Sequence, residues 1–255
     1  MMTKAQERRW VIGFAIVVLL VTSIPYLLGF WLQGKDWVFT GFVFGVEDGN
    51  SYIAKMLAGS YGAWLFRTPY TAFPQNGVLA FLPYLLLGKL VAPPGSHEQL
   101  VALFQLFRWV AGIAFILATY DFVGIFVEDI RLRRLGMAVA TIGGGLGWLS
   151  IIGNHLPLEM YSPESFGFLE VYGLPHLALA RALLLWGLVI FLKYLEDKNK
   201  NVTVILTCGL LWLLLGLMQP LTVMIGWAII GAFLIVLGVV FYWRKSTAGR
   251  WIGAS

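Results

Sequence analysis

The chain has 255 residues, of which 59% are hydrophobic and only 12% charged, and its mean hydropathy is +0.81. So few charges cannot cover the surface of a soluble domain, so this composition excludes a soluble globular protein and predicts an integral membrane protein. The formal net charge is +5, but the basic residues are divided among short segments. That distribution argues against a nucleic-acid partner, because such a surface needs its cations on one face or one helix.

The first predicted span runs from Trp10 to Leu32 and contains no charged side chain. As a helix it would cross about 30 Å of hydrocarbon, and it is too long for the apolar core of a signal peptide. Cytosolic loops of membrane proteins collect Lys and Arg, which predicts a multi-pass protein of the cell membrane with a cytosolic N-terminus. Four basic clusters are expected in the cytosol: Lys4/Arg8/Arg9, Arg131/Arg133/Arg134, Lys193/Lys198/Lys200 and Arg244/Lys245/Arg250.

The apolar runs and the basic clusters between them predict an all-α fold, a polytopic transmembrane helical bundle that forms one domain over residues 1–255. A long outer loop over about residues 33–100, with surface helices, follows the first span. Further spans are expected at 101–126, 135–153, 174–195, 202–218 and 220–242, with a second outer loop over about 154–173.

The alternative to these six spans is a seventh over residues 77–92. This run is short, contains Pro83 and Lys89, and is followed by Pro93-Pro94-Gly95. Because proline interrupts a helix, we interpret the run as an interfacial or re-entrant helix of the outer loop.

A polar cluster from Val46 to Met56 follows the first span, and in it two carboxylates, Glu47 and Asp48, are adjacent. Asn50 or Ser51 is expected to cap a short surface helix there. The helix dipole favours anions at the N-terminal end, so one interpretation of the acidic pair is purely structural. The other is catalytic, because a positioned carboxylate can accept a proton in a reaction.

Two arginines are placed within predicted spans. Arg108 and Arg181 each lie about 10 Å below the outer end of a span, on the same side as the acidic pair. A charge at that depth costs several kcal/mol unless it is paired or reaches water, so both are candidates for binding substrate. Snorkelling to the interface or pairing with a structural acid is the alternative.

The second outer loop follows a glycine-rich stretch, residues 143–147, which permits close helix approach or a break where the backbone lines a cavity. No His-x-x-x-His spacing occurs near it, so the support for a metal site is weak, and a solvated acidic loop is the alternative. The side chains that could hold a divalent cation or contact a phosphate-bearing substrate are Glu159, Glu164, Glu170, His155 and His176.

The N-terminal stub, the single span and the acidic pair that follows it resemble the GT-C class of membrane glycosyltransferases, which use polyprenyl-phosphate-linked sugars. Two runs of the chain, Glu47 to Met56 and Trp64 to Thr71, resemble those of mannosyltransferase-like bacterial members. Members of this class continue through further spans, so the resemblance also implies that this chain is an N-terminal portion or module. The resemblance covers roughly residues 10 to 195 and rests on four stretches: Glu47 to Met56, Trp64 to Thr71, Gly145 to Trp148 and Pro175 to Ala180.

The resemblance implies roles for particular acids. An acid of the first outer loop acts as general base in that class, a role that falls on Asp48 or its neighbour Glu47. Acids of a second outer loop assist in binding substrate or metal, which points to Glu159 or Glu164.

The expected reaction is an inverting transfer of a sugar from a polyprenyl-phosphate donor to a glycan, lipid or protein acceptor. Arg108 and Arg181 are expected to hold the departing phosphate, and His176 is grouped with them as a substrate-binding residue. The leaving group is already a phosphate, so a divalent cation is optional. Two alternatives stay open: a transporter or flippase component, and a non-catalytic assembly subunit.

Overall fold

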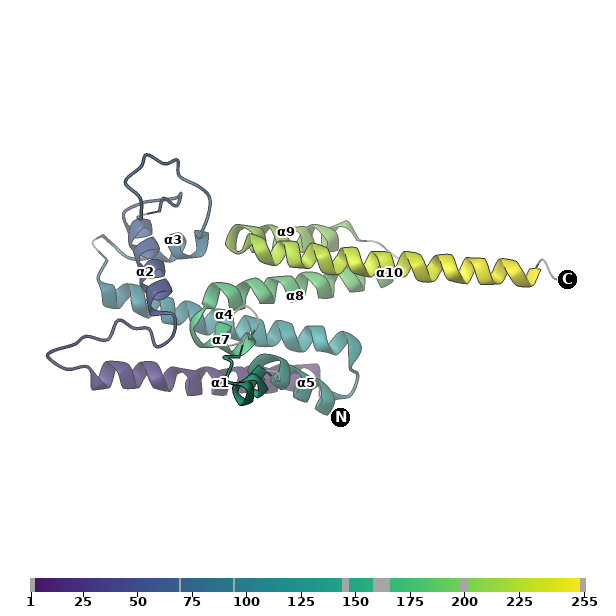
Figure 1. Ribbon diagram of the computed structural model, residues 1–255, viewed down its shortest axis with the longest axis horizontal. Coiled ribbons are helices and arrows are strands. Elements are labelled where there is room, and N and C mark those ends of the chain that lie inside the picture. The colour runs from purple at the N-terminus through teal and green to yellow at the C-terminus, as the bar shows by residue number, and fades with distance from the viewer. Residues whose placement is uncertain are drawn as a thin grey trace.

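The computed structural model describes residues 3–68, 70–93, 95–143, 147–157, 166–197 and 201–252, without the side chains of Trp148 and residues 244–252. Within these ranges the regular secondary structure is helical, apart from one isolated antiparallel bridge between Phe66 and Val78, which confirms the all-α prediction for them. The elements, shown in Figure 1, are α1 (Lys4–Leu32), α2 (Val46–Ser60), α3 (Leu82–Gly88), α4 (His97–Phe126), α5 (Ile130–Ile142), the 3₁₀ helix η1 (Gly147–Gly153), α7 (Gly167–Gly173), α8 (Pro175–Glu196), α9 (Val202–Met218) and α10 (Pro220–Ile252).

Four helices are long and apolar enough to cross a membrane: α1, α4, α8 and residues 220–243 of α10. They match four of the predicted spans. α9 also falls on a predicted span, but its 17 residues extend only about 26 Å, which is short of the hydrocarbon thickness. α1 and α4 each begin with a capping box, formed by Thr3 with Gln6 and by Ser96 with Gln99.

The predicted span over residues 135–153 is wrong as a continuous helix. α5 ends at Ile142 and Gly143 is extended, after which the chain resumes as the 3₁₀ helix η1. With 13 residues, α5 is only about 20 Å long. Glycine ends it because glycine is a poor helix former, a preference that the count of apolar residues does not include.

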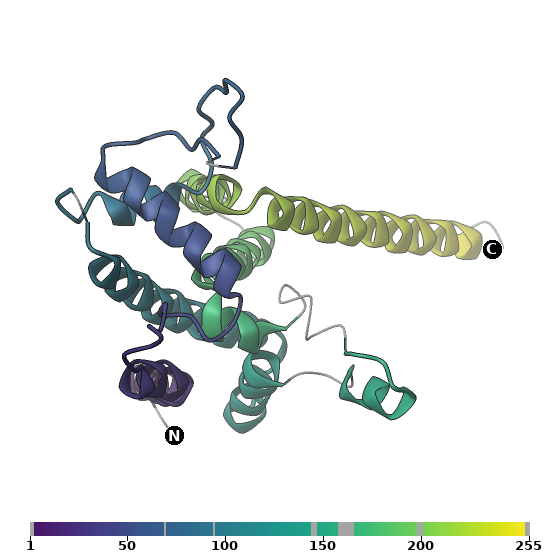
Figure 2. The same ribbon diagram turned by 60° about the vertical axis from the view of Figure 1, so that its left-hand side comes forward.

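α4 and α8 lie side by side and run in the same direction (Figure 1). The residues that follow α4 in the sequence must therefore lead back to the end of the bundle where α4 began before α8 can start. Short elements in this part of the chain, α5, η1 and α7, take the place of one long helix. Met137 of α5 is fully buried against Val11 of α1 and Ile116 of α4. α7 packs against α1, α4, α5 and α8, so α5 and α7 are part of the bundle, whereas η1 projects from it (Figure 2).

The seventh span over residues 77–92 is also wrong, because the only helix in that range is α3, with seven residues. α2 and α3 both lie between α1 and α4 in the sequence. In Figures 1 and 2, α2 crosses the direction of α1 and α4 at one end of the bundle. We call this end the α2 end, and the opposite end, which holds Lys4 and Phe126, the Lys4 end.

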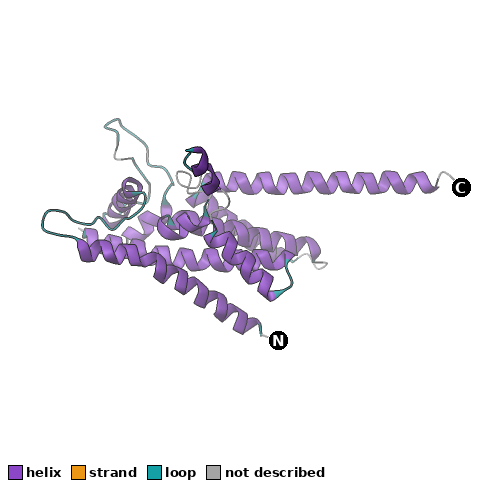
Figure 3. Cartoon of the chain, turned by 60° about the horizontal axis from the view of Figure 1, so that its bottom comes forward, coloured by secondary structure: helices purple, strands orange, loops and turns teal. Residues whose placement is uncertain are grey.

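Glycines bring α2 and α3 into backbone contact. A Cβ atom on Gly59 would lie 2.1 Å from the carbonyl oxygen of Leu85, and one on Gly88 would lie 1.8 Å from that of Met56. No larger residue fits at either position unless the two helices move apart. α10 behaves differently, since it extends from the bundle as a single rod (Figure 3).

Candidate functional site

The acidic pair lies in the first turn of α2, but the predicted cap is wrong. The N-cap is Gly45, in a left-handed conformation with φ +60°, so α2 begins before Asn50 and Ser51. No side chain caps this helix. Glu47 and Asp48 are exposed beside backbone N–H groups that lack intrahelical acceptors, which is a favourable place for carboxylates.

Below Asp48, α2 packs on an aromatic cluster made of Tyr52, Tyr84 and His176. The rings of Tyr52 and Tyr84 stack with centroids 4.5 Å apart, and the ring of His176 lies 5.0 Å from that of Tyr52. The Tyr84 hydroxyl is hydrogen-bonded to Nδ1 of His176 at 2.7 Å. All three side chains are buried. The cluster therefore fixes α2 and α3 against the first turn of α8.

Asp48 also acts electrostatically on Tyr84, a member of this cluster. Burial raises the pKa of Tyr84 well above its ordinary value, and the negative charge of Asp48 adds to this rise. Tyr52 is four residues after Asp48, so the two project from the same face of α2. The predicted residues Asp48 and His176 are thus brought to the same part of the α2 end.

Lys55 is a buried cation on α2 that the sequence analysis did not single out. Its ammonium donates a hydrogen bond of 2.6 Å to Oγ of Ser51 and lies 4.3 Å from the centre of the Phe81 ring. Burial lowers the pKa of Lys55, and the charge of Asp48 opposes this shift. Lys55 is therefore within electrostatic reach of Asp48.

Lys55 lines a cavity of about 90 Å³ together with Ser51, Leu65 and Arg67. A second cavity, of about 450 Å³, is lined by Trp64, Leu65 and Arg67. The two share Ala58, Leu65 and Arg67, so they adjoin. We call them together the Arg67 cleft. Within the described residues neither Lys55 nor Arg67 makes an ion pair, so the cleft presents two cations to a ligand.

Arg108 is buried within α4, but its described partners are neutral. The residues that accept its hydrogen bonds tie α4 to α1 and α7, and its guanidinium also lies over the ring of Tyr26 at 4.8 Å. The acceptors are Gln105 Oε1 at 2.7 Å, Ser23 Oγ at 2.5 Å, Thr22 Oγ1 at 3.1 Å and the Val171 carbonyl at 3.4 Å. This arrangement gives Arg108 a clear structural role.

Arg181 of α8 forms an ion pair of 2.5 Å with the buried Glu170 of α7. This contact is the pairing with a structural acid that was the alternative to substrate binding. Neither arginine lines the Arg67 cleft, nor does Asp48. The side chains predicted to surround one phosphate therefore do not lie together. His176 belongs to the aromatic cluster, whereas Arg108 and Arg181 are engaged inside the bundle.

Glu159 and Glu164 lie outside the described residues, as does most of the stretch Gly145 to Trp148. His155 is exposed after η1. In the part of the chain that the structure describes, no three His, Cys, Asp or Glu side chains are grouped in a way that could hold a metal ion. The described donors therefore suggest no place for a divalent cation.

The cations of the Arg67 cleft were missed because composition gives no sign that Lys55 is buried. Both residues did fall within stretches that carried the family resemblance, which was the one signal available. Comparison of the chain with protein-family models, with curated proteins and with solved structures finds no match. The chemistry of the α2 end is therefore the basis for inferring a function.

Proposed function

We propose that this chain is a polytopic membrane glycosyltransferase, or its N-terminal module, which transfers a sugar from a polyprenyl-phosphate donor on the extracytoplasmic side. One observation carries the proposal. The carboxylates of Glu47 and Asp48 lie on a helix across one end of a bundle of apolar helices, and the unpaired cations of the Arg67 cleft lie on the same helix and the segment after it.

The basic residues at the other end support an orientation for the proposed enzyme. Lys4, Arg8, Arg133 and Lys193, from three of the basic clusters, line one cavity at the Lys4 end. Because Lys and Arg collect in cytosolic loops, this end and the N-terminus face the cytosol. The α2 end then faces outward. Lys198 and Lys200 lie outside the described residues.

A polyprenyl-phosphate donor keeps its phosphate at the membrane surface while its tail stays in lipid. An enzyme that uses it needs a carboxylate and cations at that boundary, and the α2 end supplies both. Arg108 and Arg181 are engaged inside the bundle. We therefore transfer the phosphate-binding role to Lys55 and Arg67, whose cationic donors suit a phosphate.

In the proposed reaction, Asp48 accepts the proton of an acceptor hydroxyl while the hydroxyl oxygen attacks the anomeric carbon. The bond between that carbon and the phosphate oxygen breaks, and polyprenyl phosphate leaves with the bonding electrons. Lys55 and Arg67 neutralise the charge that develops on the leaving phosphate. The aromatic cluster holds α2 in place during this step.

Arg67→Gln tests the assignment of the phosphate site. The change removes one cation from the cleft, and a hydrogen bond to a charged group contributes about 1.5 to 3 kcal/mol. We expect polyprenyl phosphate to bind at least about tenfold more weakly. Binding can be measured by titrating a radiolabelled polyprenyl phosphate into the full chain in nanodiscs.

Lys35→Gln is the matched control, since Lys35 is an exposed cation that precedes α2 and does not line the cleft. We expect it to leave binding unchanged. Equal weakening in both variants would show a general surface attraction, and unchanged binding in Arg67→Gln would remove that residue from the site. Release of polyprenyl phosphate from a radiolabelled polyprenyl-phosphate hexose, but no turnover of a nucleotide sugar, is the expected activity.

A lipid flippase component is the second candidate, and the short helices α5 and α7, which pack in the bundle where one long helix was predicted, favour it. Irregular backbone at membrane depth occurs where it lines a cavity or is buried in protein, as in transporters. A flippase would move a lipid-linked sugar between leaflets of a proteoliposome and leave the bond between sugar and phosphate intact. Product analysis after such an assay separates the two functions.

A further inference from the structure

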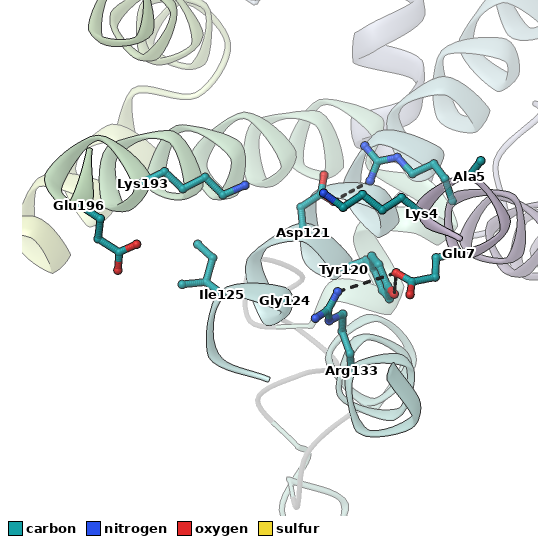
Figure 4. A pocket seen from close by; sticks show the side chains of 11 residues that line it. Lys4, Ala5, Glu7, Tyr120, Asp121, Gly124, Ile125, Arg133, Lys193 and Glu196 are labelled. Carbon is teal, nitrogen blue, oxygen red and sulfur yellow. Dashed lines mark hydrogen bonds and ion pairs between the residues drawn. The ribbon is translucent and has the colours of Figure 1, made fainter. Parts of the chain in front are cut away.

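A cavity of about 660 Å³ opens at the Lys4 end, on the opposite side of the bundle from the Arg67 cleft (Figure 4). The ends of α1, α4 and α8 and the beginning of α5 surround it. Its cations are Lys4, Arg8, Arg133 and Lys193, and its acids are Glu7, Asp121 and Glu196. The proposed sugar transfer uses none of these residues.

Two of the acids are already neutralised. Asp121 accepts a hydrogen bond of 2.6 Å from Arg8 and one of 2.9 Å from the indole N–H of Trp186. Glu7 accepts a hydrogen bond of 3.1 Å from the Tyr120 hydroxyl and lies 3.9 Å from Arg133. These contacts join α1, α4, α5 and α8 and hold the walls of the cavity in place.

Two cations stay unpaired. Lys4 and Lys193 make no ion pair within the described residues, and Figure 4 shows the Lys193 ammonium pointing across the cavity toward Asp121. Glu196 lies on the same helix as Lys193, at the edge of the view in Figure 4. The cavity therefore has two ammonium groups without an ion pair among the described residues, while Asp121 and Glu7 are each paired with an arginine.

Exposed apolar side chains follow the lining residues along two of the helices that form the cavity. Trp10 and Ile12 of α1 and Phe126 of α4 are exposed close to it in the sequence. A ligand held there can place its charged group among the lysines and its apolar chains along these side chains. Basic pockets between the ends of membrane helices bind the phosphates of anionic lipids in this manner.

We propose that this cavity is a binding site for a phosphate group, and that the phosphate belongs to an anionic membrane lipid. Lys4 and Lys193 contact the phosphate, while Arg8 and Arg133 are positioning residues that keep Asp121 and Glu7 neutralised. The site is independent of the sugar transfer proposed for the α2 end. It anchors the first turn of α1 and the last turn of α8 to the membrane surface at the Lys4 end.

The test uses the full chain in detergent, to which phosphatidylglycerol, phosphatidylcholine or free glycerol phosphate is added. Binding is measured by native mass spectrometry and by the shift in melting temperature. We expect phosphatidylglycerol to bind and the double variant Lys4→Gln/Lys193→Gln to bind it at least tenfold more weakly. Lys4→Arg/Lys193→Arg should retain the binding. Both lysines are exposed, so melting without lipid should stay at the parental temperature.

Arg9→Gln/Arg131→Gln is the matched control, because it removes two exposed charges from the same end that do not line the cavity. It should bind phosphatidylglycerol like the parent. An equal loss in both double variants, or a loss in neither, overturns the site. If free glycerol phosphate binds as tightly as phosphatidylglycerol, a soluble phosphate ester is the ligand and the lipid assignment is overturned. Binding of phosphatidylcholine at the same strength also overturns the assignment to an anionic lipid.

Discussion

Replacing Asp48 with Asn is expected to lower sugar transfer by a factor of about 10² to 10⁴ without unfolding the protein. The amide has nearly the shape of the carboxylate but cannot accept the proton of the acceptor hydroxyl. The side chain is exposed on the first turn of α2, so the substitution disturbs little packing. The rate should be measured in single-turnover experiments with saturating polyprenyl-phosphate sugar, which isolates the transfer step from donor binding.

Glu47→Gln is the natural control because it removes the same charge from the preceding residue. Asp48 lies within electrostatic reach of Lys55 and Tyr84, and for this reason we assign the base to Asp48. Glu47→Gln should change the rate only a few-fold. If Asp48→Asn transferred sugar at the parental rate while Glu47→Gln were inactive, the base would be Glu47. Parental rates in both variants would remove the acidic pair from the chemistry.

Gly88→Ala is expected to destabilise the protein by about 3 kcal/mol, at the upper end of the usual cost of overpacking. The new methyl group would meet the Met56 carbonyl oxygen at 1.8 Å, and a backbone atom within a helix cannot rotate away. α2 and α3 would have to separate. That movement would loosen the stacking of Tyr52 on Tyr84, so donor binding at the Arg67 cleft should also weaken.

Gly13→Ala provides the comparison for this substitution. A Cβ atom on Gly13, in α1, would meet nothing within 4 Å. Alanine is the better helix former by about 1 kcal/mol, so this variant should be unchanged or slightly more stable. Unfolding in mixed micelles measures both variants against the parent. A similar small effect in the two would contradict the close contact between α2 and α3.

The sequence predicted those features that depend on local patterns. Long apolar runs located α1, α4, α8 and α10, because a membrane-spanning helix requires an unbroken stretch of such residues. The position of the acidic pair at a helix start was also predictable from the run after the first span. The cap itself was not, because Gly45 acts through its left-handed backbone and has no side chain to signal it.

Features that depend on how helices pack could not be predicted in this way. Hydropathy favoured a span at residues 135–153, although the helix ends at Ile142 and Gly143 is extended. The position of Arg108 within a long apolar helix was predictable, but its bonds to Thr22 and Ser23 depend on how α1 is rotated against α4. Likewise, Lys55 is buried only because Phe81 and Phe66 fold over α2.

The most direct test of the proposed donor site is a photo-crosslinking map. A polyprenyl phosphate with a diazirine next to its phosphate would be irradiated with the full chain in nanodiscs, and the labelled peptides identified by mass spectrometry. We predict labels within α2 and between Trp64 and Arg67, displaced by excess unlabelled polyprenyl phosphate and reduced in Arg67→Gln. Labels confined to the Lys4 end, or to the passage from α5 to α7, would contradict a donor site at the α2 end.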